Sequence, residues 1–131
     1  THFYVGDPGN GRSNNNNSNY LAMLFASVEG VSKVGSYSVS NASVNKVVDV
    51  GFAPRFVLIK SVNASSTNWI VTDTTRGSTD NSTPLLFLNL NAQQNFANQM
   101  YFSGNTFVIK KDTAGGQLFT SGGEYIYYAH A

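Results

Sequence analysis

The two ends of this chain share one sequence layout, and this internal similarity constrains the fold more than any other feature. Near the start, residues 3–5 (Phe-Tyr-Val) lead through a loop rich in Gly and Asn to residues 20–26 (Tyr-Leu-Ala-Met-Leu-Phe-Ala). Near the end, residues 106–109 lead through glycine-bearing loops to residues 125–131 (Tyr-Ile-Tyr-Tyr-Ala-His-Ala). Each end reads as a strand, a polar loop and a second strand that opens on Tyr. Self-similarity of this kind is typical of repeated structural units.

The repetition divides the chain into two parts. Residues 1–26 are expected to be the C-terminal strand-loop-strand part of a preceding repeat unit. Residues 27–131 are expected to be a complete unit that ends at the native C-terminus of its polypeptide. The total of 131 residues suits one domain with its own core. Because the strands expected within 1–26 lack the rest of their unit, we expect the isolated chain to self-associate.

Between the two ends, the hydrophobic period is close to two, with turn residues between short runs of β-branched and aromatic side chains. This pattern predicts an all-β fold, an antiparallel β-sandwich resembling a jelly roll, with at most one short helix. The helix candidate is the segment 91–100, where apolar residues recur at four-residue spacing; a single turn or an irregular crossing fits equally well. The other expected strands are 44–50, 55–60, 68–73 and 84–88.

Charge is sparse, and this excludes several function classes. Charged residues make up 11% of the chain, the formal net charge is +1, and Lys and Arg form no run. Nucleic-acid binding needs a concentrated basic footprint, so it is not expected. No apolar run is long enough to span a bilayer, so membrane insertion is not expected either. The chain has no cysteine, which excludes disulfides and thiolate metal sites. A surface of amides and hydroxyls suits an extracellular or virion structural protein.

Five motifs follow one another in order along the chain. They are residues 26–37, residues 51–60, Trp69, Asp73-x-x-Arg76-Gly77 and residues 125–131 with His130 in place of an apolar residue. This ordered set resembles a repeat domain of unknown function found in bacteriophage virion proteins, notably tail fibres and related appendages. The similarity covers about 27–131 as a full unit and 1–26 as the tail of a preceding one.

The resemblance implies a structural or adhesive component of the phage particle surface, outside the cell. Its partners would be other virion subunits, with a homotrimer favoured because virion fibres commonly trimerise, and a host surface glycan. The departure at His130 indicates a position that faces solvent or a neighbouring subunit. The resemblance transfers no catalytic residue to this chain.

Asp73 and Arg76 lie three residues apart, just after an expected strand and before Gly77. One interpretation makes them a ligand-binding pair or half of a glycosidase site. Glycosidases need two positioned carboxylates, and the acidic residues here are scattered along the sequence. We therefore favour a local ion pair that fixes the turn, with Gly77 supplying a positive φ angle.

Aromatic residues and amides supply the candidate contact residues. Tyr125 and Tyr127 share one face of the last strand and Tyr128 lies on the other, so one Tyr-bearing face must pack inward or meet another surface. Subunit packing is favoured over sugar binding for these residues. The loop residues Asn14, Asn15 and Asn16 are further candidates for a subunit interface or a glycan contact. Trp69 is expected to anchor the core.

No catalytic residue, metal ligand or cofactor is predicted. His2 and His130 lie at opposite ends of the chain, with no closely spaced acidic cluster to complete a metal site. Calcium would need several carboxylates, and Asp7 stands nearly alone in its loop. No serine lies in a Gly-x-Ser-x-Gly elbow. We expect a structural and adhesive module of a tail or head fibre; the alternatives are a purely structural decoration or fibre-shaft module and, more remotely, a polysaccharide-degrading enzyme.

Overall fold

The computed structural model describes residues 2–6, 17–40, 43–111 and 117–131, and these residues form nine strands and no helix. All strand pairs among them are antiparallel, which confirms the predicted all-β sandwich. The strands are β1 (Ser32–Ser38), β2 (Lys46–Asp49), β3 (Phe56–Ser61), β4 (Ile70–Asp73), β5 (Thr83–Phe87), β6 (Asn95–Ala97), β7 (Met100–Ser103), β8 (Thr106–Ile109) and β9 (Glu124–His130).

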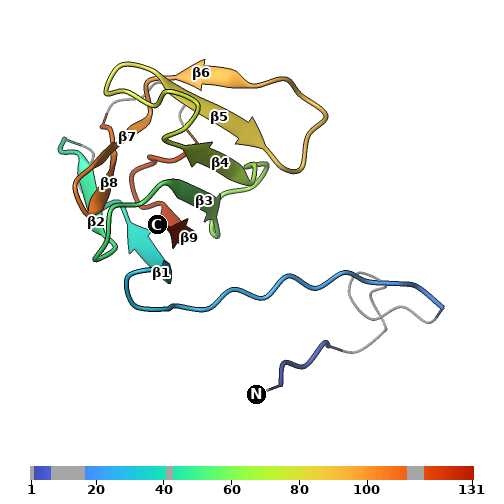
Figure 1. The fold of residues 1–131 in the computed structure, drawn as a ribbon. Helices are drawn as coiled ribbons and strands as arrows, with labels where there is room; N and C mark the ends of the chain where they lie inside the picture. The colour runs from blue at the N-terminus through green and yellow to red at the C-terminus, as the bar shows by residue number, and fades with distance from the viewer. Residues whose placement is uncertain (1, 7–16, 41–42, 112–116) are drawn as a thin grey trace.

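The strands form two layers (Figure 1). A six-stranded sheet has the order β1-β9-β3-β4-β5-β6, and a three-stranded sheet has the order β2-β8-β7. The last strand, β9, lies between β1 and β3, so the C-terminal residues pair with strands on both sides. β1 and β2 follow each other in sequence but lie in different sheets, each as an edge strand.

The core lies between the two sheets and is rich in aromatic side chains. The rings of Tyr37 and Tyr125 stack with their centroids 4.7 Å apart. Phe107 of the small sheet meets Tyr127 edge to face at 5.2 Å. The Tyr37 hydroxyl donates a hydrogen bond of 3.0 Å to the Leu118 carbonyl, which satisfies its polar end inside the core. Burial, with Tyr125 nearby, raises the pKa of Tyr37 well above its ordinary value.

The helix candidate at 91–100 is not a helix. Residues 95–97 form β6 and pair with β5, while Met100 begins β7 and pairs with β8. Met100 is fully buried whereas Phe96 is exposed, so these apolar residues do not line one helical face. Asn, which has a low helix propensity, recurs at positions 91, 95 and 98, and pairing with neighbouring strands prevails over a weak helical pattern.

The strands expected within 1–26 are also not formed. In the described parts of this region, residues 2–6 and 17–26, no strand is present, and the chain runs away from the sandwich as an extended arm (Figure 1). A strand needs hydrogen-bonding partners on at least one side, and no strand of the sandwich pairs with these residues. The division into a preceding unit and a complete unit stays a prediction.

Candidate functional site

Alternation along β9 sorts the predicted contact tyrosines onto two faces. Tyr125 and Tyr127 point into the core and are 1% and 6% exposed. Ile126 and Tyr128 point to the opposite side of the sheet, where Ile126 is exposed and Tyr128 is half-buried. Of the two outcomes expected for a Tyr-bearing face, packing inward is the one found for Tyr125 and Tyr127, which are core residues and not surface contacts. Of the three candidate tyrosines, Tyr128 is the one that faces away from the core.

Gly35 makes room for one of the buried tyrosines. It lies opposite Tyr127 in the β1–β9 register. A Cβ atom at position 35 would lie 2.5 Å from the Tyr127 hydroxyl oxygen and 2.6 Å from the ring carbon that bears it. The Tyr127 ring therefore lies directly against the β1 backbone, which only a residue without a side chain permits.

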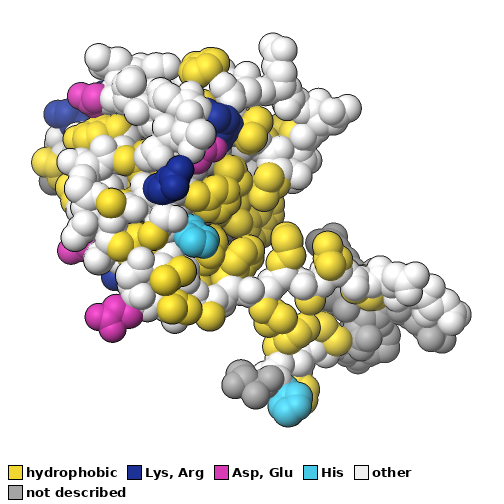
Figure 2. Space-filling model, viewed as in Figure 1, with side chains coloured by type: hydrophobic (Ala, Val, Ile, Leu, Met, Phe, Trp, Pro, Cys, Tyr) yellow, Lys and Arg dark blue, Asp and Glu magenta, His cyan; other side chains and the backbone are white. Residues whose placement is uncertain are grey.

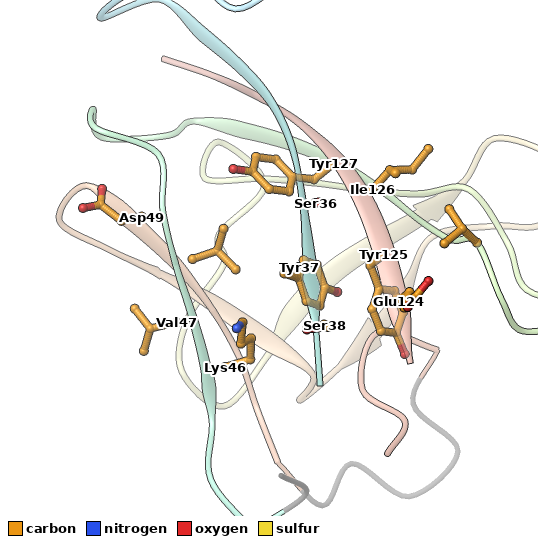
Figure 3. Close-up of a pocket in the computed structure, with 12 residues that line it drawn as sticks. Ser36, Tyr37, Ser38, Lys46, Val47, Asp49, Glu124, Tyr125, Ile126 and Tyr127 are labelled. Carbon is orange, nitrogen blue, oxygen red and sulfur yellow. The ribbon is translucent and has the colours of Figure 1, made fainter. Parts of the chain in front are cut away.

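A slot opens between the edge strands of the two sheets, with a volume of about 590 Å³. Figure 3 shows Lys46, Val47 and Asp49 of β2 on one side and Glu124 of β9 on the other, with Tyr37 of β1 between them. We call this the edge slot. Its lining residues are Ser36, Tyr37, Ser38, Lys46, Val47, Val48, Asp49, Val62, Glu124, Tyr125, Ile126 and Tyr127.

The edge slot offers hydrogen-bonding groups but no aromatic platform. Tyr37, Tyr125 and Tyr127 are all buried, so little of their ring surface is open to a sugar. Burial, and then the negative charge of Asp49, raises the pKa of Tyr127, so this hydroxyl stays protonated at neutral pH. Asp49 and Glu124 lie at opposite ends of the slot (Figure 3), and the described residues contain no group of three His, Cys, Asp or Glu that could hold a metal ion.

The second candidate surface is the outer face of the six-stranded sheet, the side turned away from the small sheet. The strand register aligns four apolar side chains across it, because Val34 pairs with Tyr128, Tyr128 with Leu58, and Leu58 with Val71. Ile126 and Trp69 flank this row. We call these six residues the outer face: Val34, Leu58, Trp69, Val71, Ile126 and Tyr128. Figure 2 shows hydrophobic side chains gathered on the side of the sandwich that faces the arm.

The arm crosses part of the outer face and leaves a groove beside it. The Phe25 ring lies 4.5 Å from the Tyr128 ring, centroid to centroid. Met23 and Phe25 form one wall of a groove of about 270 Å³, and Val34, Leu58, Trp69, Ile126 and Tyr128 belong to the rest of its lining. Both walls are apolar. Such a groove favours an apolar insert over a sugar, because it has few polar groups to replace the hydrogen bonds that a sugar makes with water.

Trp69 is not the core anchor that the sequence predicted. It is 40% exposed, whereas the next residue, Ile70, is 2% exposed and belongs to the core. The Trp69 N–H donates to Asn89 Oδ1 at 2.9 Å, and its carbonyl accepts from Leu88, which holds it beside β4. Both faces of this strand are apolar in sequence, so alternation alone did not show which face points inward.

Asp73 and Arg76 form the predicted turn pair. Arg76 Nε lies 2.5 Å from Asp73 Oδ2, and the Arg76 backbone N–H donates to Asp73 Oδ1 at 2.9 Å. Gly77 has a φ of 86°, as the turn interpretation required. Arg76 Nη1 also donates to Gln94 Oε1 at 3.0 Å, which ties the turn to the segment before β6. The pair is a structural connection between two parts of the chain.

The pKa of Asp73 follows from these contacts. Burial acts to raise it, but hydrogen bonds from the Arg76 side chain and backbone, together with the Arg76 charge, act in the opposite direction. The net effect is a pKa below the ordinary Asp value. Asp73 is therefore a stable carboxylate, which suits a structural partner and does not suit a general acid.

One family model matches the chain over residues 1–131, under the description Domain of unknown function (DUF7483). The chain belongs to this family. The DUF7483 match includes residues 1–26 together with the sandwich, and its description names no activity, ligand or partner. No curated protein and no solved structure matches the chain. Within the described residues, no helix has the length and hydropathy needed to cross a membrane.

For this DUF7483 chain, the sequence pointed to single residues, Tyr125 and Tyr127 in the edge slot and Tyr128 on the outer face, but to neither surface as a whole. The candidate residues Asn14, Asn15 and Asn16 lie outside the described residues. The charged residues of the edge slot were not anticipated, because they come from strands that are remote in sequence. The outer face was also missed, although Leu58 and Val71 stand in continuous apolar runs, 56–59 and 69–71. Such runs are a signal of strands covered on both faces.

Proposed function

We propose that the chain is a structural module of a bacteriophage virion appendage, a tail or head fibre, and that its outer face contacts other virion subunits. The proposal draws on the resemblance of residues 26–37, 51–60 and 125–131 to such proteins and on the surface described above. It places the module on the particle surface, outside the host cell, and assigns it no catalytic activity.

One observation carries this proposal, the apolar character of the outer face. In an antiparallel sheet with one solvated side, that side normally carries polar residues in alternation with the core residues. Here Val34, Trp69 and Ile126 are each at least 40% exposed on the side that should be polar. A contiguous apolar patch on a soluble protein marks an interaction surface. A subunit in a fibre has such a surface, because its neighbours cover it.

The low charge of the chain supports an assembly role. With 11% charged residues and a net charge of +1, copies of this module repel one another little at close range. Contacts built on apolar burial keep their strength across a wide range of salt concentrations, unlike contacts built on charge.

Localisation in the particle tests the proposal. Antibodies raised against the chain should label an appendage in immunogold electron microscopy of purified phage that encodes it, and mass spectrometry should detect its peptides in gradient-purified particles. Antibodies against an unrelated phage protein that is absent from particles serve as the control. Absence of the chain from purified particles would overturn the proposal.

A second candidate function is adhesion to neutral glycans on a host surface, and the edge slot is the observation that favours it. Ser36, Ser38, Lys46, Asp49 and Glu124 surround a space of about 590 Å³ with donors and acceptors. Weak binding per copy becomes effective when many copies act together. The K46A and D49N variants of the assembled fibre should lose binding on a glycan array or to host cells, and the surface variant D80N should keep it. Unchanged binding by K46A and D49N would exclude the edge slot.

A further inference from the structure

We infer that the outer face receives residues 20–25 of a second copy of this chain, so that copies associate by exchanging their N-terminal arms. We call residues 20–25 the arm segment. The inference rests on the assembly role proposed above and deepens it, because it names both the partner and the segment that docks.

The arm segment has apolar side chains that its own sandwich leaves exposed. Leu21 is 89% exposed, Leu24 75% and Met23 69%. These residues are apolar enough to favour burial, and they have no charged residue among them, since residues 17–26 contain none. An exposed apolar segment of this kind marks an interaction site.

The outer face accepts side chains of the kind that the arm segment carries. Phe25 already lies against Tyr128 at 4.5 Å, which shows how an arm side chain docks on this face. Beside that contact, the groove of about 270 Å³ has apolar walls and no insert. A cavity of about 150 Å³ holds a benzene molecule, so the groove has room for a leucine, methionine or aromatic side chain.

The way the arm leaves the sandwich explains why its own residues do not fill the groove. The Ser32 hydroxyl donates to the Ala26 carbonyl at 2.8 Å, and the Val34 N–H donates to Ser27 Oγ at 3.0 Å. A tight turn joins these points, with a bridge between Val28 and Ser32 and a φ of 70° at Gly30. These contacts fix the exit at the edge of the sheet, and the arm then runs away from the sandwich (Figure 1).

Association with a second copy covers the exposed arm residues and the groove at the same time. In each copy Leu21, Met23 and Leu24 of the arm segment are largely exposed, and the outer face has an open groove, so exchange covers both. A short, constrained hinge favours exchange of a segment between copies over its closure onto the same copy. Charge does not oppose the contact. Lys60, which neighbours Ile126 in the sheet register, donates to the Thr67 carbonyl at 2.6 Å, away from the groove.

The test uses sedimentation velocity of the full chain and three matched Lys variants. Leu24→Lys damages the arm segment, Val34→Lys damages the outer face, and Val47→Lys is the control on exposed β2 of the other sheet. The unmodified chain and Val47→Lys should form oligomers at micromolar concentration. Leu24→Lys and Val34→Lys should each sediment as monomers. An equimolar mixture of these two should form dimers, because the intact arm of Val34→Lys docks on the intact face of Leu24→Lys.

Trp69 reports the same event without a label, because it is the single tryptophan and lies in the groove. As concentration rises, its emission should shift to shorter wavelength and acrylamide should quench it less. Leu24→Lys should abolish both changes while keeping the monomer's circular dichroism spectrum.

Three results would overturn the inference. One is a monomeric unmodified chain at every concentration. Another is an oligomer that Val34→Lys disrupts and Leu24→Lys does not, which would show that outer faces pair directly. The third is a mixture of the two variants that remains monomeric, which would show that the arm covers only its own copy. None of these results removes the chain from phage particles, so localisation still decides the proposed function separately.

Discussion

Residues 20–26 and strand β9 share a sequence layout and differ completely in structure. β9 lies in the middle of the six-stranded sheet, with β1 on one side and β3 on the other. Residues 20–26 form no strand and project from the sandwich as part of the arm. Residues 20–26 begin with Tyr and are apolar throughout, and β9 continues from Glu124 with Tyr125 and four more apolar residues before His130. The difference shows that partners decide whether such a stretch becomes a strand.

The partners of β9 act through both backbone and side chains. Its backbone groups pair alternately with β1 and β3, and its inward residues Tyr125 and Tyr127 pack against Tyr37 and Phe107. The arm has one aromatic contact with the sandwich, Phe25 on Tyr128, among the described residues. Isolated strands are not stable in water, so a pattern that predicts a strand also predicts that a partner must exist.

The largest expected effect comes from comparing one substitution in β9 with one in the arm. Tyr125→Ala should lower the free energy of unfolding by about 3–5 kcal/mol, because it removes a fully buried ring from the core. Tyr4→Ala, in the arm, should change it by less than about 0.5 kcal/mol, because that side chain is 93% exposed. Urea denaturation at submicromolar concentration measures both. Equal losses in the two variants would break the comparison.

The next effect tests the close approach of β9 to β1. Gly35→Ala should lower the free energy of unfolding by about 1–3 kcal/mol, because the added Cβ would overlap the Tyr127 ring. Gly6→Ala, in the arm, is the matched control, since its Cβ meets nothing within 4 Å. Thermal denaturation followed by circular dichroism measures both. A Gly35→Ala variant as stable as Gly6→Ala would show that Tyr127 does not lie against β1.

A smaller effect concerns the turn after β4. Asp73→Asn should lower the free energy of unfolding by about 1–2 kcal/mol, because it removes a charge-assisted hydrogen bond with Arg76. Asp80→Asn should cost less than about 1 kcal/mol, because the ion pair of Asp80 with Lys110 is largely exposed on the Asp80 side. Urea denaturation at pH 7 measures both, and a larger loss for Asp80→Asn would contradict the assignment.

The pH dependence of this effect has a definite sign. The folded pKa of Asp73 is lowered, so its contribution is fully present above the ordinary Asp value of about 3.9 and is lost as the pH falls through the lower folded value. The stability gap between the unmodified chain and Asp73→Asn should therefore close in acid. A gap that stays constant from pH 7 to pH 2 would show that the ion pair is not its cause.

The smallest effect tests the point where the arm touches the sandwich. Phe25→Ala should lower the free energy of unfolding by about 0.5–1.5 kcal/mol, which is the range of a single aromatic pair. Leu24→Ala, next to it and more exposed, should be neutral in dilute solution within about 0.5 kcal/mol. Both are measured below the concentration at which copies associate. A neutral Phe25→Ala would mean that the arm is independent of the outer face in the monomer.

The local hydrophobic pattern was sufficient to predict most of the strands of the sandwich. The apolar runs at 55–60, 68–73 and 84–88 correspond to β3, β4 and β5. Alternation placed Tyr125 and Tyr127 on one face of β9 and Tyr128 on the other, but it did not show which face points inward. The Asp73–Arg76 turn was predictable because its three-residue spacing and the following glycine are local features. Each of these rests on side chains that lie close together in sequence.

The features that the sequence did not predict depend on tertiary contacts between elements that are remote in sequence. Trp69 and Val71 look as suitable for a core as Ile70, and only the position of the small sheet decides which face is covered. The segment 91–100 became β6 and the start of β7 because β5 and β8 supply partners. Residues from β1, β2 and β9 come together in the edge slot, and no local spacing in the sequence predicts that arrangement.

Hydrogen–deuterium exchange of the dilute monomer tests most directly the claim that partners, and not local pattern, make β9 a strand. The account predicts that amides of residues 125–130 exchange among the slowest in the chain. It also predicts that amides of residues 21–25 exchange at rates close to those of an unstructured peptide. Comparable slow exchange in both stretches, or fast exchange in both, would contradict it.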